Sequence, residues 1–337
     1  MKLNFSQIKD VTLGAVRMEE MEDGVHFFRF TAEQEALYKE RKESFYVKSF
    51  STSGVQLRFR TNSGTLFLSA DVSGGTTRSF FAIDVFADGK KVGVIKNFTE
   101  EQLCGDYVKA KFPLGNVSGT FDLGEEEKEV RICFPWSVIA VLKELSLDDG
   151  SFVLPVKPSK KMLCFGDSIT HGYDAAYPSN KYITKLAWAL DAEEHNKAIG
   201  GEIFFPALAA AKEDFEPDYI TVAYGTNDWS HCTKEEFTKN CKDFYDHLCR
   251  TYPDAKVFAI TPIWRKDMNQ SKPFGDFMSV CETIRETAVE HDNVFVIEGH
   301  GFVPGDEALF SDLRLHPNDK GFAYYAENLI KRVKETL

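Results

Sequence analysis

Ser168 is the residue best placed to act as a nucleophile, and it lies in the stretch Gly166-Asp167-Ser168. The apolar run 162–165 precedes it and is typical of a short buried strand. Where a buried strand breaks into a turn and a helix start, backbone N–H groups favour negative charge, which suits a nucleophilic hydroxyl. The alternative for this stretch is an ordinary Asx or Ser turn that caps a helix.

Two later stretches contain hydrogen-bond donors that could stabilise a developing oxyanion. Gly200 and Gly201 follow a short apolar step, and such a glycine pair can offer a backbone N–H. Asn227 follows the strongly apolar run 219–224 and can offer a side-chain N–H. Taken alone, each of these stretches is also compatible with a plain turn.

His316 is the candidate general base. It lies just before the pattern of the closing helix, and Asp312, four residues upstream, could orient its imidazole. A lone histidine is more often structural. The nearby carboxylate makes His316 the best candidate base among the eight histidines of the chain.

The elements that must position these residues change along the chain. Residues 1–155 favour short strands separated by Gly, Ser and Asp turns, which indicates an all-β sandwich of jelly-roll type. We expect strands at 46–50, 55–60, 65–70, 79–86, 92–95 and 129–134, and a helix at 31–41. Prolines and lysines interrupt the pattern at 154–161, as in a linker, so we divide the chain into domains 1–157 and 158–337.

After the linker, strand and helix patterns alternate, which favours a parallel sheet with helices on both faces. In such sheets ligands bind beyond the carboxyl ends of the strands, where most of the candidate residues lie. Thr233 and Glu236 form a capping box that predicts a helix start. The expected strands are 162–165, 219–224, 257–260 and 294–297, and the expected helices are 181–190, 233–251, 277–291 and 321–335.

The candidate residues, in this order, resemble the four blocks of the SGNH, or GDSL, hydrolase family over about residues 160–337. The resemblance implies a flavodoxin-like α/β sheet and ester cleavage through an acyl-enzyme. It implies Ser168 as the nucleophile, His316 as the base and Asp312 as its acid. It also implies an oxyanion hole formed by Ser168, Gly201 and Asn227.

The chain departs from the family pattern at one point. The usual spacing is Asp-x-x-His, but Leu313 occupies the place of the acid, and Asp312 is one residue further from His316. Either the turn is one residue longer, or Asp312 orients the histidine imperfectly. Gly200 would replace Gly201 in the oxyanion hole if that block shifts by one residue.

The whole chain is similar to SGNH enzymes with an N-terminal jelly-roll domain, among them carbohydrate esterases that remove acetyl groups from sugars. We therefore expect a serine esterase whose partner is a small-molecule ester, an acetylated saccharide. Tyr173, Trp229 and Trp264 could shape its pocket, or could simply pack between loops. The alternatives are a lysophospholipase or thioesterase, and a carbohydrate-binding protein with a decayed esterase site.

Composition and motifs also limit which partners, compartments and cofactors the protein could have. The 337 residues carry a net charge of -12, which argues against nucleic-acid or anionic-membrane partners. The sequence has no signal-peptide pattern, no long apolar run and no C-x-x-C among its seven cysteines, so we expect a cytoplasmic protein with free thiols. No G-x-S-x-G, phosphate-loop or H-E-x-x-H motif occurs, and we expect neither a metal nor a cofactor. The oligomeric state is left open.

Overall fold

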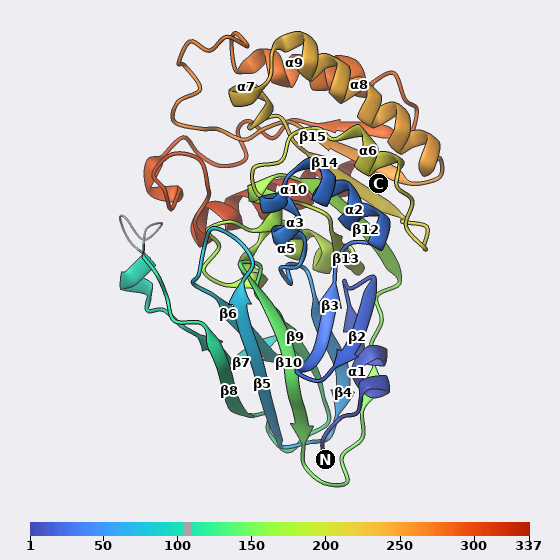
Figure 1. Ribbon diagram of the computed structural model, residues 1–337, viewed down its shortest axis with the longest axis vertical. Helices are drawn as coiled ribbons and strands as arrows, with labels where there is room; N and C mark the ends of the chain where they lie inside the picture. The colour runs from blue at the N-terminus through green and yellow to red at the C-terminus, as the bar shows by residue number, and fades with distance from the viewer. Residues whose placement is uncertain (104–109) are drawn as a thin grey trace.

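The computed structural model describes residues 1–103 and 110–337, and their strands form three sheets (Figure 1). Two sheets are antiparallel and belong to residues 1–157, here called the N-terminal half. The third is parallel and belongs to residues 158–337, the C-terminal half. Cysteines within the described residues are free thiols, whereas Cys104 lies outside those residues.

The antiparallel sheets pack face to face as a sandwich. One has the order β2 (Arg17–Met21), β3 (Gly24–Phe28), β10 (Val138–Leu147), β5 (Thr65–Gly74) and β8 (Gly115–Asp122). The other has the order β1 (Thr12–Leu13), β4 (Gln56–Thr61), β9 (Lys128–Cys133), β6 (Ala82–Ala87) and β7 (Lys90–Lys96), with β11 (Leu154–Pro155) paired to β4. Leu57 and Ile132 from one sheet meet Leu68 and Leu142 from the other in one buried apolar cluster, which α1 (Phe5–Val11) closes.

The parallel sheet has the order β13 (Ala192–Asn196), β12 (Lys160–Gly166), β14 (Tyr219–Ala223), β15 (Lys256–Ile260) and β16 (Val294–Ile297). The first strand in the chain therefore lies second in the sheet, as in flavodoxin-like folds. Its α-helices are α4 (Ser168–His171), α5 (Tyr182–Ala189), α6 (Pro206–Ala210), α7 (Asp228–His231), α8 (Lys234–Thr251), α9 (Met278–Ala288) and α10 (Asp319–Thr336). Short 3-10 turns occur at Glu100–Leu103, Pro178–Asn180 and Glu307–Leu309.

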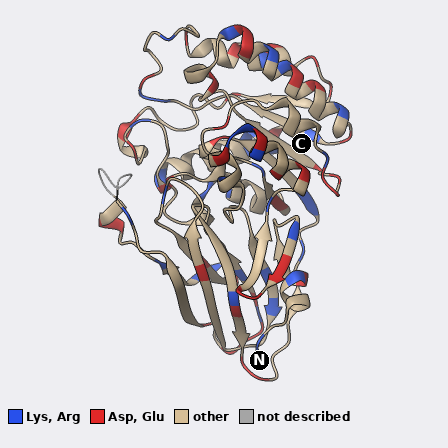
Figure 2. Ribbon diagram, viewed as in Figure 1, with Lys and Arg blue, Asp and Glu red and all other residues tan. Residues whose placement is uncertain are grey.

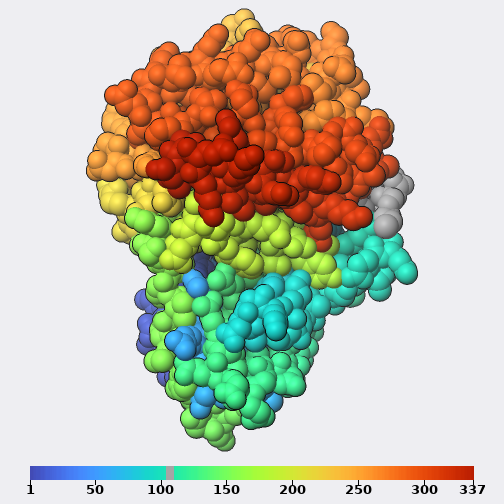
Figure 3. All heavy atoms as spheres, turned by 180° about the vertical axis from the view of Figure 1, so that it is seen from behind, coloured from blue at the N-terminus to red at the C-terminus, as the bar shows by residue number. Residues whose placement is uncertain are grey.

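Strand β12 shows how the helices cover both faces of this sheet. Met162 and Cys164 belong to the apolar cluster that contains residues of α5 and α10. Leu163 and Phe165 point the other way, into the cluster that contains residues of α8 and α9. Because successive side chains of a strand face opposite sides, a continuous apolar run is what a doubly covered strand requires. Figure 3 shows α10, the last helix, on the outside of the rear face.

The predicted fold class is confirmed, and so is the capped helix that starts after Thr233. The predicted strand at 46–50 is wrong, because these residues lie in and just after α3 (Glu43–Ser49). Phe45 and Ser49, four residues apart, are the buried positions of this helix, so the spacing that matters is helical. The predictions omitted β2, β3, β8, β10 and β13.

Helices α2 (Ala32–Arg41) and α3 belong to the N-terminal half in sequence but pack on the C-terminal half (Figure 1). Phe30, Tyr38 and Phe45 lie in the same apolar cluster as residues of the parallel sheet and α8. The division at residue 157 remains a prediction, since the segment around α2 and α3 shares its core with the other half.

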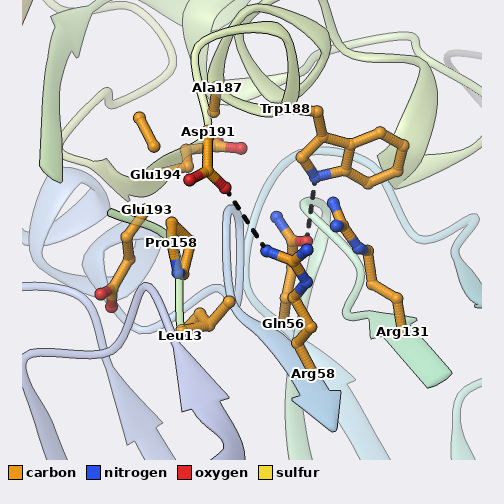
Figure 4. A pocket seen from close by; sticks show the side chains of 11 residues that line it. Leu13, Gln56, Arg58, Arg131, Pro158, Ala187, Trp188, Asp191, Glu193 and Glu194 are labelled. Atoms are coloured by element: carbon orange, nitrogen blue, oxygen red, sulfur yellow. Dashed lines mark hydrogen bonds and ion pairs between the residues drawn. The ribbon is translucent and has the colours of Figure 1, made fainter. Parts of the chain in front are cut away.

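A second contact between the halves surrounds a small cavity of about 50 Å³ (Figure 4). There Trp188 Nε1 donates to Gln56 Oε1 at 3.1 Å, and Arg58 lies 3.8 Å from Asp191. Arg131 stacks on the Trp188 ring. None of the candidate catalytic residues lines this cavity.

Charged residues of both signs occur on both halves, so that the excess of acidic groups is not gathered in one element (Figure 2). Helix α8, for example, carries lysines, an arginine and carboxylates together, and α9 carries Arg285 with two glutamates (Figure 2). Among the described helices, none is both long enough and apolar enough to cross a membrane.

Candidate active site

Ser168 is held at the junction between β12 and α4. The Asp167 side chain caps the helix start by accepting the Ile169 N–H at 2.9 Å. A Cβ at Gly166 would lie 2.2 Å from Thr170 Oγ1, so only glycine allows the strand to turn this closely onto the helix. The alternative expected from sequence, a helix-capping turn, is therefore present, and it lies at the carboxyl end of a parallel strand, which is where ligands bind in such sheets.

A continuous chain of hydrogen bonds runs from Ser168 through His316 to Asp312. Ser168 Oγ lies 2.8 Å from His316 Nε2, and His316 Nδ1 lies 2.8 Å from Asp312 Oδ2. The extra residue in the spacing, Leu313, adopts a left-handed conformation with φ 54° and is exposed. The turn is thus one residue longer, and Asp312 still reaches the imidazole.

The other oxygen of Asp312 organises this turn. Its Oδ1 accepts three backbone N–H bonds, from residues 314–316, at 2.7 to 3.1 Å. Burial alone would raise the pKa of Asp312, but the hydrogen bonds from His316 and from the backbone lower it below its usual range. Burial acts against a charged His316, yet Asp312 and Asp174 outweigh it and raise the pKa of His316 above its ordinary value.

Asp174 is a second carboxylate at His316 that the sequence analysis missed. Its Oδ2 lies 3.4 Å from His316 Nδ1, and its side chain is completely buried. Arg78 of the N-terminal half holds it with two hydrogen bonds, Nε to Oδ1 at 2.8 Å and Nη2 to Oδ2 at 3.2 Å. The only signal available in the sequence was the nearness of Asp174 to Ser168.

Among the described residues, Asp174, Asp312 and His316 are also the group whose ligand atoms lie close enough together to hold a metal ion. In this arrangement each already has a protein partner, because Arg78 pairs with Asp174 and Asp312 bonds to His316. The donor set therefore fits a proton-transfer network that is closed by the protein itself.

Gly201 and Asn227 lie on neighbouring loops that are tied together. Asn227 Nδ2 donates to the Glu202 carbonyl at 2.9 Å, which leaves its second amide hydrogen available. Gly201 has φ 90°, a conformation that favours glycine, and its residue is exposed. The Gly200 N–H, by contrast, donates to His171 Nδ1 at 3.2 Å. Of the two glycines, Gly201 is therefore the better candidate donor to a ligand.

The buried side chains of Asp228 and Arg265 hold the same loops in place. Asp228 accepts the N–H groups of Phe204 and Gly225, each at 3.0 Å. Burial raises the pKa of Asp228 to about 7. Arg265 donates to the Thr226 carbonyl at 2.7 Å and pairs with Asp267. These contacts hold the loop that contains Asn227 without using Asn227 itself.

The predicted aromatic residues have three different environments. Tyr173 stacks on His316 with ring centroids 5.7 Å apart and is buried, so it supports the imidazole from behind. Trp229 is 1% exposed and donates to the Gly275 carbonyl, so its ring packs between loops, which is the alternative expected from sequence; a role in shaping the pocket stays a prediction. Trp264 is half-buried and packs against Phe310.

A cavity of about 260 Å³ adjoins Gly201. Its lining combines α2 and α3 of the N-terminal half with the loop after Gly201 and the end of α7. The lining residues are Arg41, Lys42, Phe45, Gly201, Ile203 and His231. Three of the six carry basic groups, so this space beside a candidate oxyanion donor is lined by both basic and apolar side chains.

Comparison with known proteins agrees with this geometry. Residues 164–324 match the model of the GDSL-like Lipase/Acylhydrolase family. No curated protein matches the chain in sequence.

Several solved structures share the fold. A salicylyl-acyltransferase from a tetracycline biosynthetic pathway has a TM-score of 0.78 at 19% identity, with 96% of this chain and 94% of that one covered. A putative GDSL-like lipase from Bacteroides ovatus has a TM-score of 0.76 at 18% identity, covering 99% and 97%. A family two carbohydrate esterase from Clostridium thermocellum, solved with cellohexaose, has a TM-score of 0.67 at 15% identity, covering 96% and 98%. The likeness extends over both halves of the chain.

Proposed function

We propose that this chain, whose residues 164–324 belong to the GDSL-like lipase/acylhydrolase family, is an ester-hydrolysing enzyme that uses Ser168 as its nucleophile and removes short acyl groups from carbohydrates. The observation that carries the proposal is the hydrogen-bonded chain Ser168–His316–Asp312. Nucleophile, base and orienting acid are within hydrogen-bond reach of one another, as serine catalysis requires.

The steps follow from this geometry. His316 Nε2 takes the proton of Ser168 as Oγ attacks the acyl carbon, and Asp312 stabilises the imidazolium that forms. His316 then gives the proton to the leaving alcohol, and an acyl-enzyme remains on Ser168. Water, deprotonated by the same imidazole, releases the acid and restores the serine.

The negative oxygen of the tetrahedral intermediate would be held by three N–H groups. These are the backbone N–H of Ser168 and of Gly201 and the side-chain amide of Asn227. Among the described hydrogen bonds, neither of the two backbone N–H groups has a protein partner, so both are free to bind an oxyanion. One such donor contributes about 3 to 4 kcal/mol to lowering the barrier.

The cavity beside Gly201 is lined by Phe45 and Ile203 as well as by basic side chains. Its volume of about 260 Å³ lies just below the range of roughly 300 to 1,000 Å³ that is usual for ligand pockets, which favours a small acyl group over a long lipid chain. The acetyl and sugar parts of the proposal rest on the carbohydrate esterases among the structures of similar fold.

A carbohydrate-binding protein with a decayed esterase site is the second candidate. The feature that favoured it was the shifted position of Asp312, but the longer turn through Leu313 carries Asp312 Oδ2 to 2.8 Å from His316 Nδ1. A site that only binds sugar has no need of this network. The alternative now has no specific observation behind it.

The test is hydrolysis of p-nitrophenyl esters of increasing acyl length by the wild type and by Ser168→Ala. We expect turnover that is fastest with acetate and is near background in the variant, and an acetylated form of the wild type in the mass spectrum. Ser279→Ala, at a half-buried serine of α9 bonded to the Asp276 carbonyl, is the matched control and should behave as wild type. Equal rates in wild type and Ser168→Ala would overturn the proposal.

The carbohydrate part needs its own substrate. Release of acetate from an acetylated xylo- or cello-oligosaccharide should exceed release of free acid from a lysophospholipid or an acyl thioester at equal concentration. Faster turnover of either lipid substrate would leave the serine mechanism standing but reject the sugar.

A further inference from the structure

We propose that Lys48, on α3 of the N-terminal half, is a positioning residue that sets the peptide group between Gly200 and Gly201, and with it the N–H that binds the oxyanion. The inference rests on the proposed function of this site. Lys48 Nζ donates to the Gly200 carbonyl at 2.5 Å, and it lies 3.9 Å from where a Cβ of Gly201 would be.

The argument begins with the geometry of one peptide bond. The carbonyl of Gly200 and the N–H of Gly201 belong to the same planar trans unit and point in opposite directions. A bond that fixes the oxygen therefore also fixes the direction of the N–H. Lys48 acts on the far side of this unit and needs no contact with the substrate.

A glycine pair needs such a clamp more than other sequences do. Neither residue has a Cβ, and Gly201 already has φ 90°, so the peptide between them can rotate at small cost. A rotated peptide would aim a carbonyl, instead of an N–H, at the oxyanion. Gly200 cannot be replaced by a stiffer residue, because a Cβ there would lie 2.5 Å from the Tyr173 ring.

The other end of Gly200 is held separately. Its N–H donates to His171 Nδ1 at 3.2 Å. Burial, with the charges of Arg29, Lys181 and Lys48, keeps the pKa of His171 well below its ordinary value, so this ring is neutral and can accept. With His171 before Gly200 and Lys48 after it, both amide groups that flank Gly200 have fixed partners.

Lys48 itself is anchored in the fold. Arg29, which is buried, donates to the Lys48 carbonyl at 3.1 Å and to the Asn196 carbonyl of β13 at 2.5 Å. Burial and the charge of Lys42 lower the pKa of Lys48 to about 8, and Glu202 opposes this shift. At pH 7 the side chain is therefore mainly an ammonium, whose bond to a carbonyl is charge-assisted and polarises the peptide.

The test compares Lys48→Met, Lys48→Arg and the control Lys331→Met, an exposed lysine of α10 that lines neither the cavity nor the candidate active site. Removing a whole oxyanion donor costs about 10²- to 10³-fold in kcat, and a loosened donor should cost about 10- to 100-fold. We expect that loss in Lys48→Met with KM nearly unchanged, a parallel loss of affinity for a trifluoromethyl ketone, and recovery of most of kcat in Lys48→Arg. Lys331→Met should match the wild type.

Several outcomes would overturn the proposal. One is a kcat of Lys48→Met within about 2-fold of the wild-type value, because the proposal expects kcat to fall at least about 10-fold. Another is a change in KM alone, which would assign Lys48 to substrate binding. Ser168→Ala, measured beside these variants, reports separately on the proposed function. If the wild type proves inactive, crystal structures of the wild type and of Lys48→Met still test the role of Lys48. The Gly200 carbonyl must have a single orientation in the wild type and more than one in the variant.

Discussion

Two loops bring a carboxylate to the same nitrogen of His316, and they differ in almost everything else. Asp312 comes from the loop before α10, is partly exposed, and lies 2.8 Å from Nδ1 with three backbone N–H bonds on its other oxygen. Asp174 comes from the segment after α4, is completely buried, and lies 3.4 Å away with Arg78 bound to both its oxygens.

The difference gives the two carboxylates different roles at His316: Asp312 orients the imidazole, whereas Asp174 supplies only a charge that is partly neutralised. Asp312 has the shorter contact and, among the residues that the structure describes, pairs with no cation except His316, so it can hold the imidazole and stabilise its charged form. Arg78 largely cancels the charge of Asp174, which then acts as half of a buried ion pair behind the ring. When two carboxylates lie near one histidine, the other groups that each carboxylate binds therefore indicate which of them orients the imidazole better than distance alone does.

The largest expected effect belongs to Asp312→Asn. The amide cannot stabilise the imidazolium and favours the wrong imidazole tautomer, so kcat should fall by about 10²- to 10⁴-fold. Steady-state kinetics with p-nitrophenyl acetate measures this loss. A fall of less than about 5-fold, far below the loss seen when such an acid is removed, would mean that Asp174 is the working acid.

Asp174→Asn should cost less activity and more stability. We expect kcat to fall only about 3- to 10-fold, because the orienting acid remains in place. The free energy of unfolding should drop by about 3 kcal/mol, since Arg78 loses its buried partner. Thermal denaturation and kinetics on the same samples check both. Loss of activity as severe as in Asp312→Asn would reverse the ranking of the two carboxylates.

The pH profile should move in opposite directions in two variants. Activity needs neutral His316, so it rises with pH through the pKa of this group, which is raised in the folded enzyme. Arg78 lowers that pKa and Asp312 raises it. Arg78→Met should therefore shift the acid limb of kcat/KM to higher pH, and Asp312→Asn should shift it to lower pH. Arg285→Met, whose side chain pairs with Glu298, is the control and should shift nothing.

The smallest effect is expected for Leu313→Gly. Leu313 is exposed and has φ 54°, a conformation that costs a leucine about 1 to 2 kcal/mol and that glycine adopts without this cost. Glycine also raises the conformational entropy of the unfolded chain, which offsets part of the gain in stability. Stability should stay within about 1 kcal/mol of wild type, and kcat within about 2-fold, because the contact between Asp312 and His316 is unchanged. A large loss of activity would show that the Leu313 side chain itself supports the turn.

The sequence was informative where function depends on short contiguous motifs. Ser168 and Asn227 each follow an apolar strand, and a parallel sheet brings such strand ends to one edge. Gly201 was found from the glycine pair, because the strand before it, β13, is not apolar. Asp312 and His316 share one short turn, so their pairing could be predicted, whereas the reach across Leu313 could not. Their catalytic roles remain proposals, although hydrogen bonds join Ser168, His316 and Asp312.

Contacts between distant segments could not be predicted. Arg78 and Lys48 act on the site from the N-terminal half, and nothing in the residues around them indicates a partner 96 or 152 positions away. Strand β13, with the sequence Ala-Glu-Glu-His-Asn, lacks a strand pattern because Glu194 is buried in an ion pair with Lys181. The packing of Trp229 against Phe277 could not be predicted either, because the two residues are far apart in sequence.

The shared core of α2 and α3 limits how this enzyme can be re-engineered. A chimera that joins residues 158–337 to a foreign sandwich would leave the sites of Phe30, Tyr38 and Phe45 empty and the apolar surface of the parallel sheet open to water. Such a fusion must carry the segment 29–50 along with the catalytic half. The unit that can be transplanted therefore consists of two separate stretches of sequence, residues 29–50 and 158–337, and a domain exchange must move both.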